Sequence, residues 1–192
     1  MSRTGNLYVV SAPSGTGKTT LCHVIMSSFD NIGYSISHTT RNPRDGESHG
    51  VDYYFTPKED FEIMIKDDSL AEWAEVHGNY YGTSVEFLEE NLKAGYDVLL
   101  DIDVNGAKQI VKKFPDAVTI FIMPPSVETL RERLLSRATD SLETIEKRLN
   151  NAKDEIAEKD FYRHIVVNDD LNVASTEMKE LIKKYRVESK YE

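Results

Sequence analysis

The feature that most constrains this chain is a glycine-rich turn, A-P-S-G-T-G-K-T at 12–19, between a short apolar run and a helical pattern. The apolar run Leu7–Val10 predicts a buried strand, and residues 18–29 repeat apolar side chains at helical spacing. A strand, a glycine-rich turn and a helix in this order predict a phosphate-binding loop, in which backbone N–H groups and the positive end of the helix hold an anion. An ordinary strand-to-helix turn is the alternative, and Gly-Lys-Thr at the helix start argues against it.

The loop has the residue types that a nucleoside triphosphate needs. Lys18 puts a positive charge near the β- and γ-phosphates, and the hydroxyl of Thr19 can bind Mg²⁺. Ala12 stands where the general pattern has glycine, which is a small change because alanine is also small. The residues that we expect to bind ATP are Ser14, Gly15, Thr16, Gly17, Lys18, Thr19 and Thr20.

Further along the chain, continuous apolar runs alternate with helical patterns. We expect strands at 97–101, 117–123 and 164–168, and helices at 105–114, 127–137, 142–159 and 171–185. Strands that are apolar throughout are typical of a parallel sheet that helices cover on both faces. The sequence therefore predicts an α/β fold, with a P-loop NTPase-type parallel sheet flanked by helices.

Residues 34–95 have a different pattern, which predicts a small α+β insert. Here the polar and apolar residues alternate, and turn and capping signals separate the short segments. We expect half-exposed strands at 34–38 and 51–55, a hairpin turn at 77–79, and helices opened by capping boxes at 56–59 and 83–86. Trp73 is expected to pack in the core.

Composition narrows the possible partners. Lys and Arg number 23 against 33 Asp and Glu, so the net charge is −10, which disfavours nucleic acid and anionic membranes. The one cysteine, Cys22, cannot form an intrachain disulfide, and no apolar run approaches the roughly 20 residues of a membrane span. The polar start of the chain does not have a signal-peptide pattern. We therefore expect a cytoplasmic protein, either a monomer or a homo-oligomer, that binds neither nucleic acid nor membrane.

Asp101 ends the expected strand at 97–101. The carboxyl ends of neighbouring parallel strands open onto the same crevice, so we expect Asp101 to bind Mg²⁺, directly or through water. Capping of the next helix is the alternative role. D-V-N-G at 103–106 is similar to a GTPase element, but the guanine motif Asn-Lys-x-Asp is absent from the sequence.

Arginines gather in two regions of this acidic chain. Guanidinium groups clamp phosphate oxygens through paired hydrogen bonds and stabilise the charge of a phosphoryl group in transfer. Arg41 and Arg44 lie in a loop that contains proline and glycine, which favours a phosphate site. Arg131 and Arg133 are expected to be solvated helix residues.

Several motifs together resemble those of the guanylate kinase family. They are S-H-T-T-R-N-P-R-D-G-E at 37–47, G-V-D-Y-Y-F at 50–55, E-W-A at 72–74, G-N-Y-Y-G-T at 78–83, L-D-I-D at 100–103 and V-N-D at 167–169. The matches follow one another in order from about residue 7 to 185, so the resemblance covers nearly the whole chain. The stretch T-T-R-x-P-R-x-G-E at 39–47 is highly specific for this family.

The resemblance implies an enzyme that transfers a phosphoryl group in line from ATP to GMP, giving ADP and GDP. Mg²⁺ is the implied cofactor, and dGMP is a further implied substrate. Three moving parts are implied: a core of residues 1–33 and 96–192, a GMP-binding insert of residues 34–95, and a helical lid at about 126–150 within the core. Ala138 departs from the family, which more often has glycine there.

The resemblance also assigns roles by matching position. The implied catalytic residues are Lys18, Arg41, Arg137 and Arg148. The GMP phosphate is then held by Ser37, Arg41, Arg44, Tyr53 and Tyr81, and guanine is read by Glu72, Thr83 and Asp103.

The chemistry of guanine fits these roles. Glu72 and Asp103 can accept hydrogen bonds from the N1–H and N2–H donors of guanine, and the hydroxyl of Thr83 can donate to O6. Adenine has no N1–H, so a buried carboxylate left unpaired disfavours AMP. A helix cap is a competing role for Thr83.

Two other interpretations of the whole chain stay open: a non-catalytic interaction module of guanylate-kinase type, and a nucleoside monophosphate kinase that uses UMP or AMP.

Overall fold

The computed structural model describes residues 4–136 and 141–189, and it confirms the α/β fold. Parallel strands form the main sheet in the order β2-β7-β1-β8-β9. They are β1 (Leu7–Ser11), β2 (Ile32–Tyr34), β7 (Asp97–Asp101), β8 (Val118–Met123) and β9 (His164–Val167). Because β1 lies between β7 and β8, the turn that follows it opens at the middle of the carboxyl edge of the sheet.

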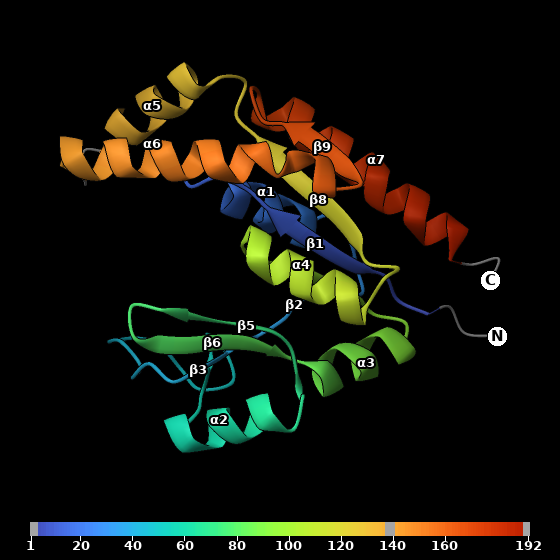
Figure 1. The fold of residues 1–192 in the computed structure, drawn as a ribbon. Helices are drawn as coiled ribbons and strands as arrows, with labels where there is room; N and C mark the ends of the chain where they lie inside the picture. Colours follow the sequence, from blue (N-terminus) through green and yellow to red (C-terminus); the bar gives the residue numbers. More distant parts are fainter. Residues whose placement is uncertain (1–3, 137–140, 190–192) are drawn as a thin grey trace.

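Helices cover both faces of this sheet (Figure 1). Helices α1 (Lys18–Met26) and α7 (Leu171–Glu188) pack on one face, and α3 (Val85–Lys93) and α4 (Val104–Lys113) pack on the other. Helices α5 (Val127–Ser136) and α6 (Leu142–Ala157) pack on each other, and α2 (Lys58–Lys66) lies away from this sheet, at the bottom of Figure 1. Successive strand residues alternate between two hydrophobic cores. Tyr8 and Val10 face the core that includes residues of α1 and α7, and Leu7 and Val9 face the core that includes residues of α3 and α4.

A second, mixed sheet lies beside the main one, below it in Figure 1. Its order is β4-β3-β6-β5, formed by β3 (His38–Thr39), β4 (Tyr54–Phe55), β5 (Leu70–Val76) and β6 (Asn79–Ser84). The predicted hairpin between β5 and β6 is confirmed, and both residues of its turn, His77 and Gly78, have positive φ angles of 50° and 77°. Helix α4 packs against β5 and so joins this sheet to the core.

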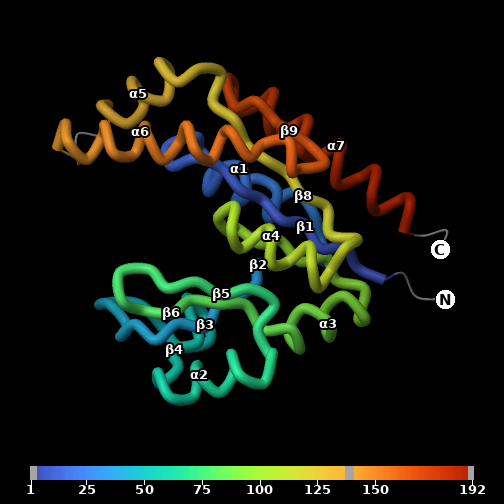
Figure 2. Tube along the Cα trace, in the orientation of Figure 1, coloured from blue at the N-terminus to red at the C-terminus, as the bar shows by residue number. Residues whose placement is uncertain are grey.

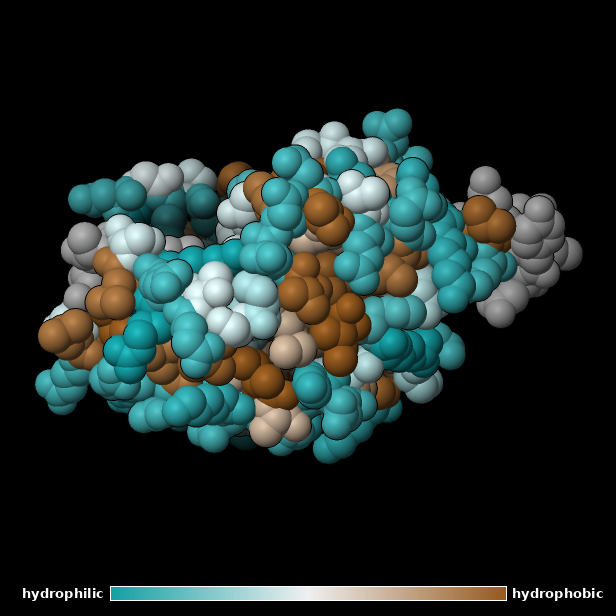
Figure 3. Space-filling view, turned by 90° about the horizontal axis from the view of Figure 1, so that it is seen from above, coloured by the Kyte–Doolittle hydropathy of each residue, from teal (hydrophilic) through white to brown (hydrophobic). Residues whose placement is uncertain are grey.

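Helices α5 and α6 form a third hydrophobic cluster, in which Leu130 and Leu134 pack with Ile145 and Leu149. The tube in Figure 2 follows α6 from this cluster across the main sheet to the start of β9. Seen from above, the surface is mostly hydrophilic with separate hydrophobic groups (Figure 3). None of the helices in 4–136 and 141–189 is long and apolar enough to span a membrane.

Several local predictions were wrong. Residues 34–38 are not one strand, because β2 ends at Tyr34 in the main sheet and β3 begins at His38 in the second sheet. Thr56 does not cap α2, because its hydroxyl donates to the carbonyl of Tyr54 and is bonded to a ring nitrogen of His38. Trp73 is 36% exposed and therefore does not pack in the core.

Candidate active site

The glycine-rich turn forms a cradle in front of α1. Gly15 and Gly17 have positive φ angles of 96° and 87°, which are conformations that glycine adopts easily. The side chain of Thr16 closes the loop by donating to the carbonyl of Pro13 at 2.8 Å. Gly17 is the N-cap of α1 and makes no side-chain cap bond, so the first N–H groups of the helix remain available to an anion.

The end of β9 braces this cradle from behind. Asn168 follows β9 and donates from Nδ2 to the carbonyl of Thr16 at 2.6 Å, and its side chain is buried. A Cβ added to Gly17 would lie 2.6 Å from the same Nδ2 atom. The loop therefore needs glycine at 17 for two reasons, its backbone angle and the close approach of Asn168.

A cavity of about 430 Å³ opens in front of the cradle. All seven residues predicted to bind ATP, Ser14 to Thr20, line it. Lys18 forms an ion pair with Asp101 at the end of β7, as the common edge of neighbouring parallel strands predicts. Asp103 and Glu155 line the same cavity, so three carboxylates share it with the ammonium group of Lys18.

A second cavity of about 690 Å³ lies between the cradle and the second sheet. Ser37, Tyr53 and Thr83, three of the residues predicted to bind GMP, line it. Thr19 and Asp101 belong to the walls of both cavities. The two cavities therefore meet at the start of α1 and the end of β7.

Glu72 is a buried carboxylate beside this second cavity. The hydroxyl of Thr83 donates to its Oε1 at 2.7 Å, and a Cβ added to Gly106 of α4 would lie 3.1 Å from its Oε2. Burial raises the pKa of Glu72 to about 7; the negative charge of Asp103 adds to this rise, while the bond from Thr83 opposes it. The helix cap of α3 is Ser84, so Thr83 is not the cap.

Asp103 has a structural bond as well as a place in the first cavity. Its Oδ1 accepts a hydrogen bond of 2.8 Å from the backbone N–H of Gly106, and it is the N-cap of α4. This bond fixes the carboxylate next to Glu72, because Glu72 lies on β5 and β5 packs on α4. Capping, which we considered for Asp101, is thus performed by Asp103.

Arg41 lies in an ordered network of the second sheet. Its guanidinium donates to both carboxylate oxygens of Glu47, at 2.9 and 3.0 Å, and lies 5.4 Å from the ring centre of Tyr53. The hydrogen bond to Glu47 holds the pKa of Arg41 above its usual range, and a hydrogen bond to Tyr81 acts in the same direction. Arg44, by contrast, is exposed.

The residues predicted for the lid are described only in part. Arg148 is half-buried on α6, and Arg137 and Ala138 lie outside the described residues. The expectation that Arg133 is only a solvated residue was wrong, since its guanidinium donates to the carbonyls of Asn168 and Asp169 at 2.9 and 3.2 Å. Arg133 also lines a cavity of about 300 Å³ with Gly17 and Thr20.

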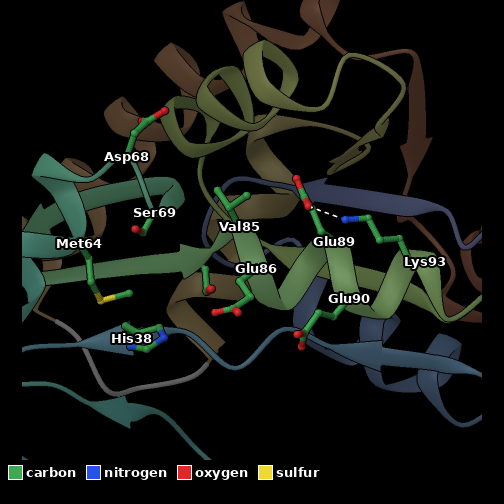
Figure 4. Close-up of a pocket in the computed structure, with 10 residues that line it drawn as sticks. His38, Met64, Asp68, Ser69, Val85, Glu86, Glu89, Glu90 and Lys93 are labelled. Atoms are coloured by element: carbon green, nitrogen blue, oxygen red, sulfur yellow. Dashed lines mark hydrogen bonds and ion pairs between the residues drawn. The ribbon is translucent and has the colours of Figure 1, made fainter.

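A further cavity, of about 680 Å³, lies near the start of α3, away from these residues (Figure 4). Acidic side chains dominate its wall, including Glu86, Glu89 and Glu90, and its one lysine, Lys93, forms an ion pair with Glu89. None of the residues predicted to bind ATP or GMP lines it. Its charge does not suit a phosphate.

The sequence predictions missed Glu155 and the structural role of Asn168. Glu155 continues the buried stripe of α6 formed by Ile145, Leu149 and Ala152. A carboxylate at a position where the helical period predicts burial is the signal that could have identified it. Asn168 has no comparable signal, because its contact with the loop is visible only in three dimensions.

Comparison with known proteins adds an independent line of argument. The family model described as Guanylate kinase matches residues 4–185. The chain is 53% identical over 182 residues to the guanylate kinase of Geobacter sulfurreducens, covering 95% of this chain and 90% of that protein. It is 46% identical to the guanylate kinase of Neisseria gonorrhoeae, covering 96% and 90%.

A solved structure agrees with the sequence relatives. The crystal structure of guanylate kinase from Anaplasma phagocytophilum matches with a TM-score of 0.73 and 33% identity, covering 96% of this chain and 88% of that one. Since the family model and these relatives span nearly the whole chain, the chain belongs to the guanylate kinase family of nucleoside monophosphate kinases.

Proposed function

We propose that this chain transfers the γ-phosphoryl group of ATP to GMP where the two cavities meet. The observation that carries the proposal is the shared wall formed by Thr19 and Asp101. A donor phosphate in the first cavity and an acceptor phosphate in the second would come together at this wall. Membership of the guanylate kinase family supports the identity of both substrates.

On the ATP side, the loop residues Ser14 to Thr20 hold the phosphates. Backbone N–H groups of the cradle donate to the phosphate oxygens, and the positive end of α1 adds to the attraction. Lys18 turns from Asp101 to the β- and γ-phosphates, because the polyanion offers it a stronger partner than one carboxylate.

On the GMP side, Glu72 and Asp103 accept the guanine N1–H and N2–H hydrogen bonds, and the hydroxyl of Thr83 can turn to donate to O6. The phosphate of GMP is held by a group of basic and hydroxyl side chains around the network of Arg41. They are Ser37, Arg41, Arg44, Tyr53 and Tyr81. Glu47 keeps the guanidinium of Arg41 in place before GMP arrives.

The transfer itself needs no covalent enzyme intermediate. A phosphate oxygen of GMP attacks the γ-phosphorus of ATP in line, and the bond from that phosphorus to the bridging oxygen of ADP breaks. Lys18, Arg41 and Arg148 neutralise the charge on the group in transfer, together with Arg137, whose position the structure does not describe.

The donor set of the shared wall fits Mg²⁺. The hydroxyl of Thr19 and the carboxylate of Asp101 are the oxygen ligands that this ion prefers, and water or phosphate oxygens complete its shell. The bound ion would neutralise part of the phosphate charge. The residues themselves orient the phosphates and exclude competing water.

We propose the three parts named from the sequence: a core of 1–33 and 96–192, a lid at about 126–150, and a GMP-binding insert of 34–95. The separate second sheet and the separate α5–α6 cluster support this division. Closure of the insert and lid would keep water from the γ-phosphate. dGMP is expected as a second acceptor.

An acceptor screen tests the proposal. ADP release from ATP is measured with GMP, dGMP, AMP and UMP as acceptors, and we expect GMP to have the largest kcat/KM. A higher kcat/KM with AMP or UMP than with GMP would mean that the enzyme is a nucleoside monophosphate kinase of another specificity. Absence of turnover and of thermal stabilisation by ATP with Mg²⁺ or by GMP would instead indicate an interaction module, since a ligand at 100 times its Kd adds about 2.7 kcal/mol.

A further inference from the structure

Glu155 has an unusual position for a carboxylate. It lies near the end of α6, and it lines the cavity in front of the glycine-rich loop together with Lys18 and Asp103. Its Oε2 atom is buried and has no hydrogen-bond partner among the residues that the structure describes. A buried carboxylate oxygen without a partner costs free energy, so its retention here calls for a partner that binds during function.

The charges around this cavity indicate what that partner is. The charged side chains in its wall are one ammonium group, that of Lys18, and the carboxylates of Asp101, Asp103 and Glu155. Such a wall repels the polyanionic triphosphate unless a cation lies between them. No three of the carboxylate, histidine or cysteine groups in the described part of the chain are arranged to hold a bare metal ion. A hydrated Mg²⁺ fits, because this ion keeps several of its waters when it binds.

The packing of α6 holds Glu155 in this position. Ala152 is buried in the α5–α6 cluster, and Ile156 packs against the core that contains β1 and α4. Arg148 lies about two helical turns earlier on α6, on the same face as Glu155. One rigid helix therefore carries both the predicted lid arginine and the carboxylate at the ATP cavity.

We propose that Glu155 is a cation-positioning residue, whose carboxylate accepts hydrogen bonds from the hydration shell of the Mg²⁺ that accompanies ATP. The inference rests on the proposed function for the identity of the nucleotide. With this role for Glu155, α6 contacts the metal–nucleotide complex through Glu155 and the phosphoryl group in transfer through Arg148. Binding of Mg²⁺ with ATP is thereby linked to the placement of the lid.

Nucleotide binding without an acceptor tests the proposal. The Kd of ATP is measured by calorimetry with excess MgCl₂ and again with EDTA. We call the Kd in EDTA divided by the Kd in MgCl₂ the metal gain, because it says how much the metal tightens ATP binding. Glu155→Gln removes the charge and keeps the shape, and we expect it to lower the metal gain about tenfold, as loss of an outer ligand partner does. Glu158→Gln is the matched control, because Glu158 is exposed near the same helix end and pairs with Lys108.

The outcomes separate this role from a structural one. If Glu155 only supports α6, both Kd values change together, and a metal gain within about threefold of that of the unaltered protein overturns the proposal. An equal loss in Glu158→Gln overturns it too, because the effect would then be one of overall charge. If Glu155→Gln does not fold, Glu155→Asp is measured in the same way, and an unchanged metal gain there contradicts the proposal. If the protein binds ATP but does not phosphorylate GMP, the proposed function is refuted. The metal gain can still be measured in that case, so the role of Glu155 is tested separately.

Discussion

The hydroxyl of Thr83 donates a 2.7 Å hydrogen bond to Oε1 of Glu72, and both side chains are buried. The bond fixes one carboxylate oxygen and leaves the other beside Gly106, where a Cβ would lie only 3.1 Å away. Because a larger residue at 106 would crowd this oxygen, Gly106 keeps the space around Glu72 open. Glu72 is thus held in one orientation beside the cavity proposed for GMP.

Replacement of Glu72 by alanine is expected to weaken the selection of guanine. The variant leaves the N1–H and N2–H groups with one acceptor fewer, a loss of about 1–3 kcal/mol. We expect the KM for GMP to rise and the gap between GMP and AMP to narrow in steady-state assays with both acceptors. Glu75→Ala, on the exposed side of the same strand, is the control. An unaltered preference would remove Glu72 from the guanine site.

The buried charge of Glu72 also predicts a pH dependence of stability. Burial raises its pKa from an ordinary value of 4.5 to about 7, so the folded protein holds this proton more tightly than the unfolded chain. The resulting stabilisation is complete below about pH 4.5 and is lost as the pH rises through about 7. Relative to the unaltered protein, Glu72→Gln should therefore gain up to about 3 kcal/mol in free energy of unfolding between pH 4 and pH 8. Denaturant unfolding at both pH values measures this change in the free energy of unfolding. If Glu75→Gln shows the same change as Glu72→Gln, the prediction is contradicted.

Loss of the Lys18 ammonium group is expected to abolish phosphoryl transfer. In Lys18→Ala the phosphates lose a charge-assisted partner, which we expect to reduce kcat by at least about 10²-fold. Binding of GMP should be largely unchanged, because Lys18 lines only the cavity proposed for ATP. Single-turnover kinetics and GMP calorimetry check the two parts. Lys108→Ala, at an exposed ion pair with Glu158, serves as control, and a normal turnover rate in Lys18→Ala would contradict the mechanism.

A methyl group at Gly17 is expected to distort the phosphate cradle. Gly17→Ala places a Cβ 2.6 Å from Nδ2 of Asn168 and strains a backbone with φ of 87°, a cost of about 1–2 kcal/mol from the angle alone. We expect a lower melting temperature and weaker ATP binding. Gly33→Ala is the matched control, since a Cβ there has no heavy atom within 4 Å. Equal effects of the two substitutions would argue against the bracing role of Asn168.

Glu47 is expected to contribute to GMP binding although it cannot itself bind a phosphate. Glu47→Ala removes both hydrogen bonds that orient the Arg41 guanidinium. The KM for GMP should rise several-fold, and the KM for ATP should stay nearly the same, because Arg41 does not line the cavity proposed for ATP. Asp45→Ala, an exposed change in the same loop, is the control. A parallel rise of both KM values would indicate general damage to the fold.

The main strands could be predicted because each is a continuous apolar run. β1, β7 and β8 are buried on both faces by helices, and burial leaves that pattern in the sequence. β9 is also an apolar run, although it lies at the sheet edge and exposes Ile165 and Val167. β2 was missed, since it is short, contains Gly33 and buries only Ile32. Its place at the edge of the main sheet comes from pairing with β7, which no local pattern encodes.

The residues of the candidate site could be predicted, but their mutual contacts could not. The spacing of the loop indicates Lys18 and Thr19, because a cradle and a helix start require them locally. The bond from Thr83 to Glu72 joins β6 to β5, and Glu155 lines a cavity with residues 12–20, which are far away in the sequence. Such contacts depend on the folded arrangement of strands and helices, so these roles stay predictions until the variants are measured.

The bond from Asn168 to Thr16 spans 152 residues of sequence. During synthesis on a ribosome, the glycine-rich turn leaves the exit tunnel long before the strand that braces it. Its sheet neighbours β7 and β8 also emerge much later than β1. We therefore expect a nascent chain to acquire affinity for nucleotide only after Asn168 has been synthesised and β7, β8 and β9 can assemble around β1.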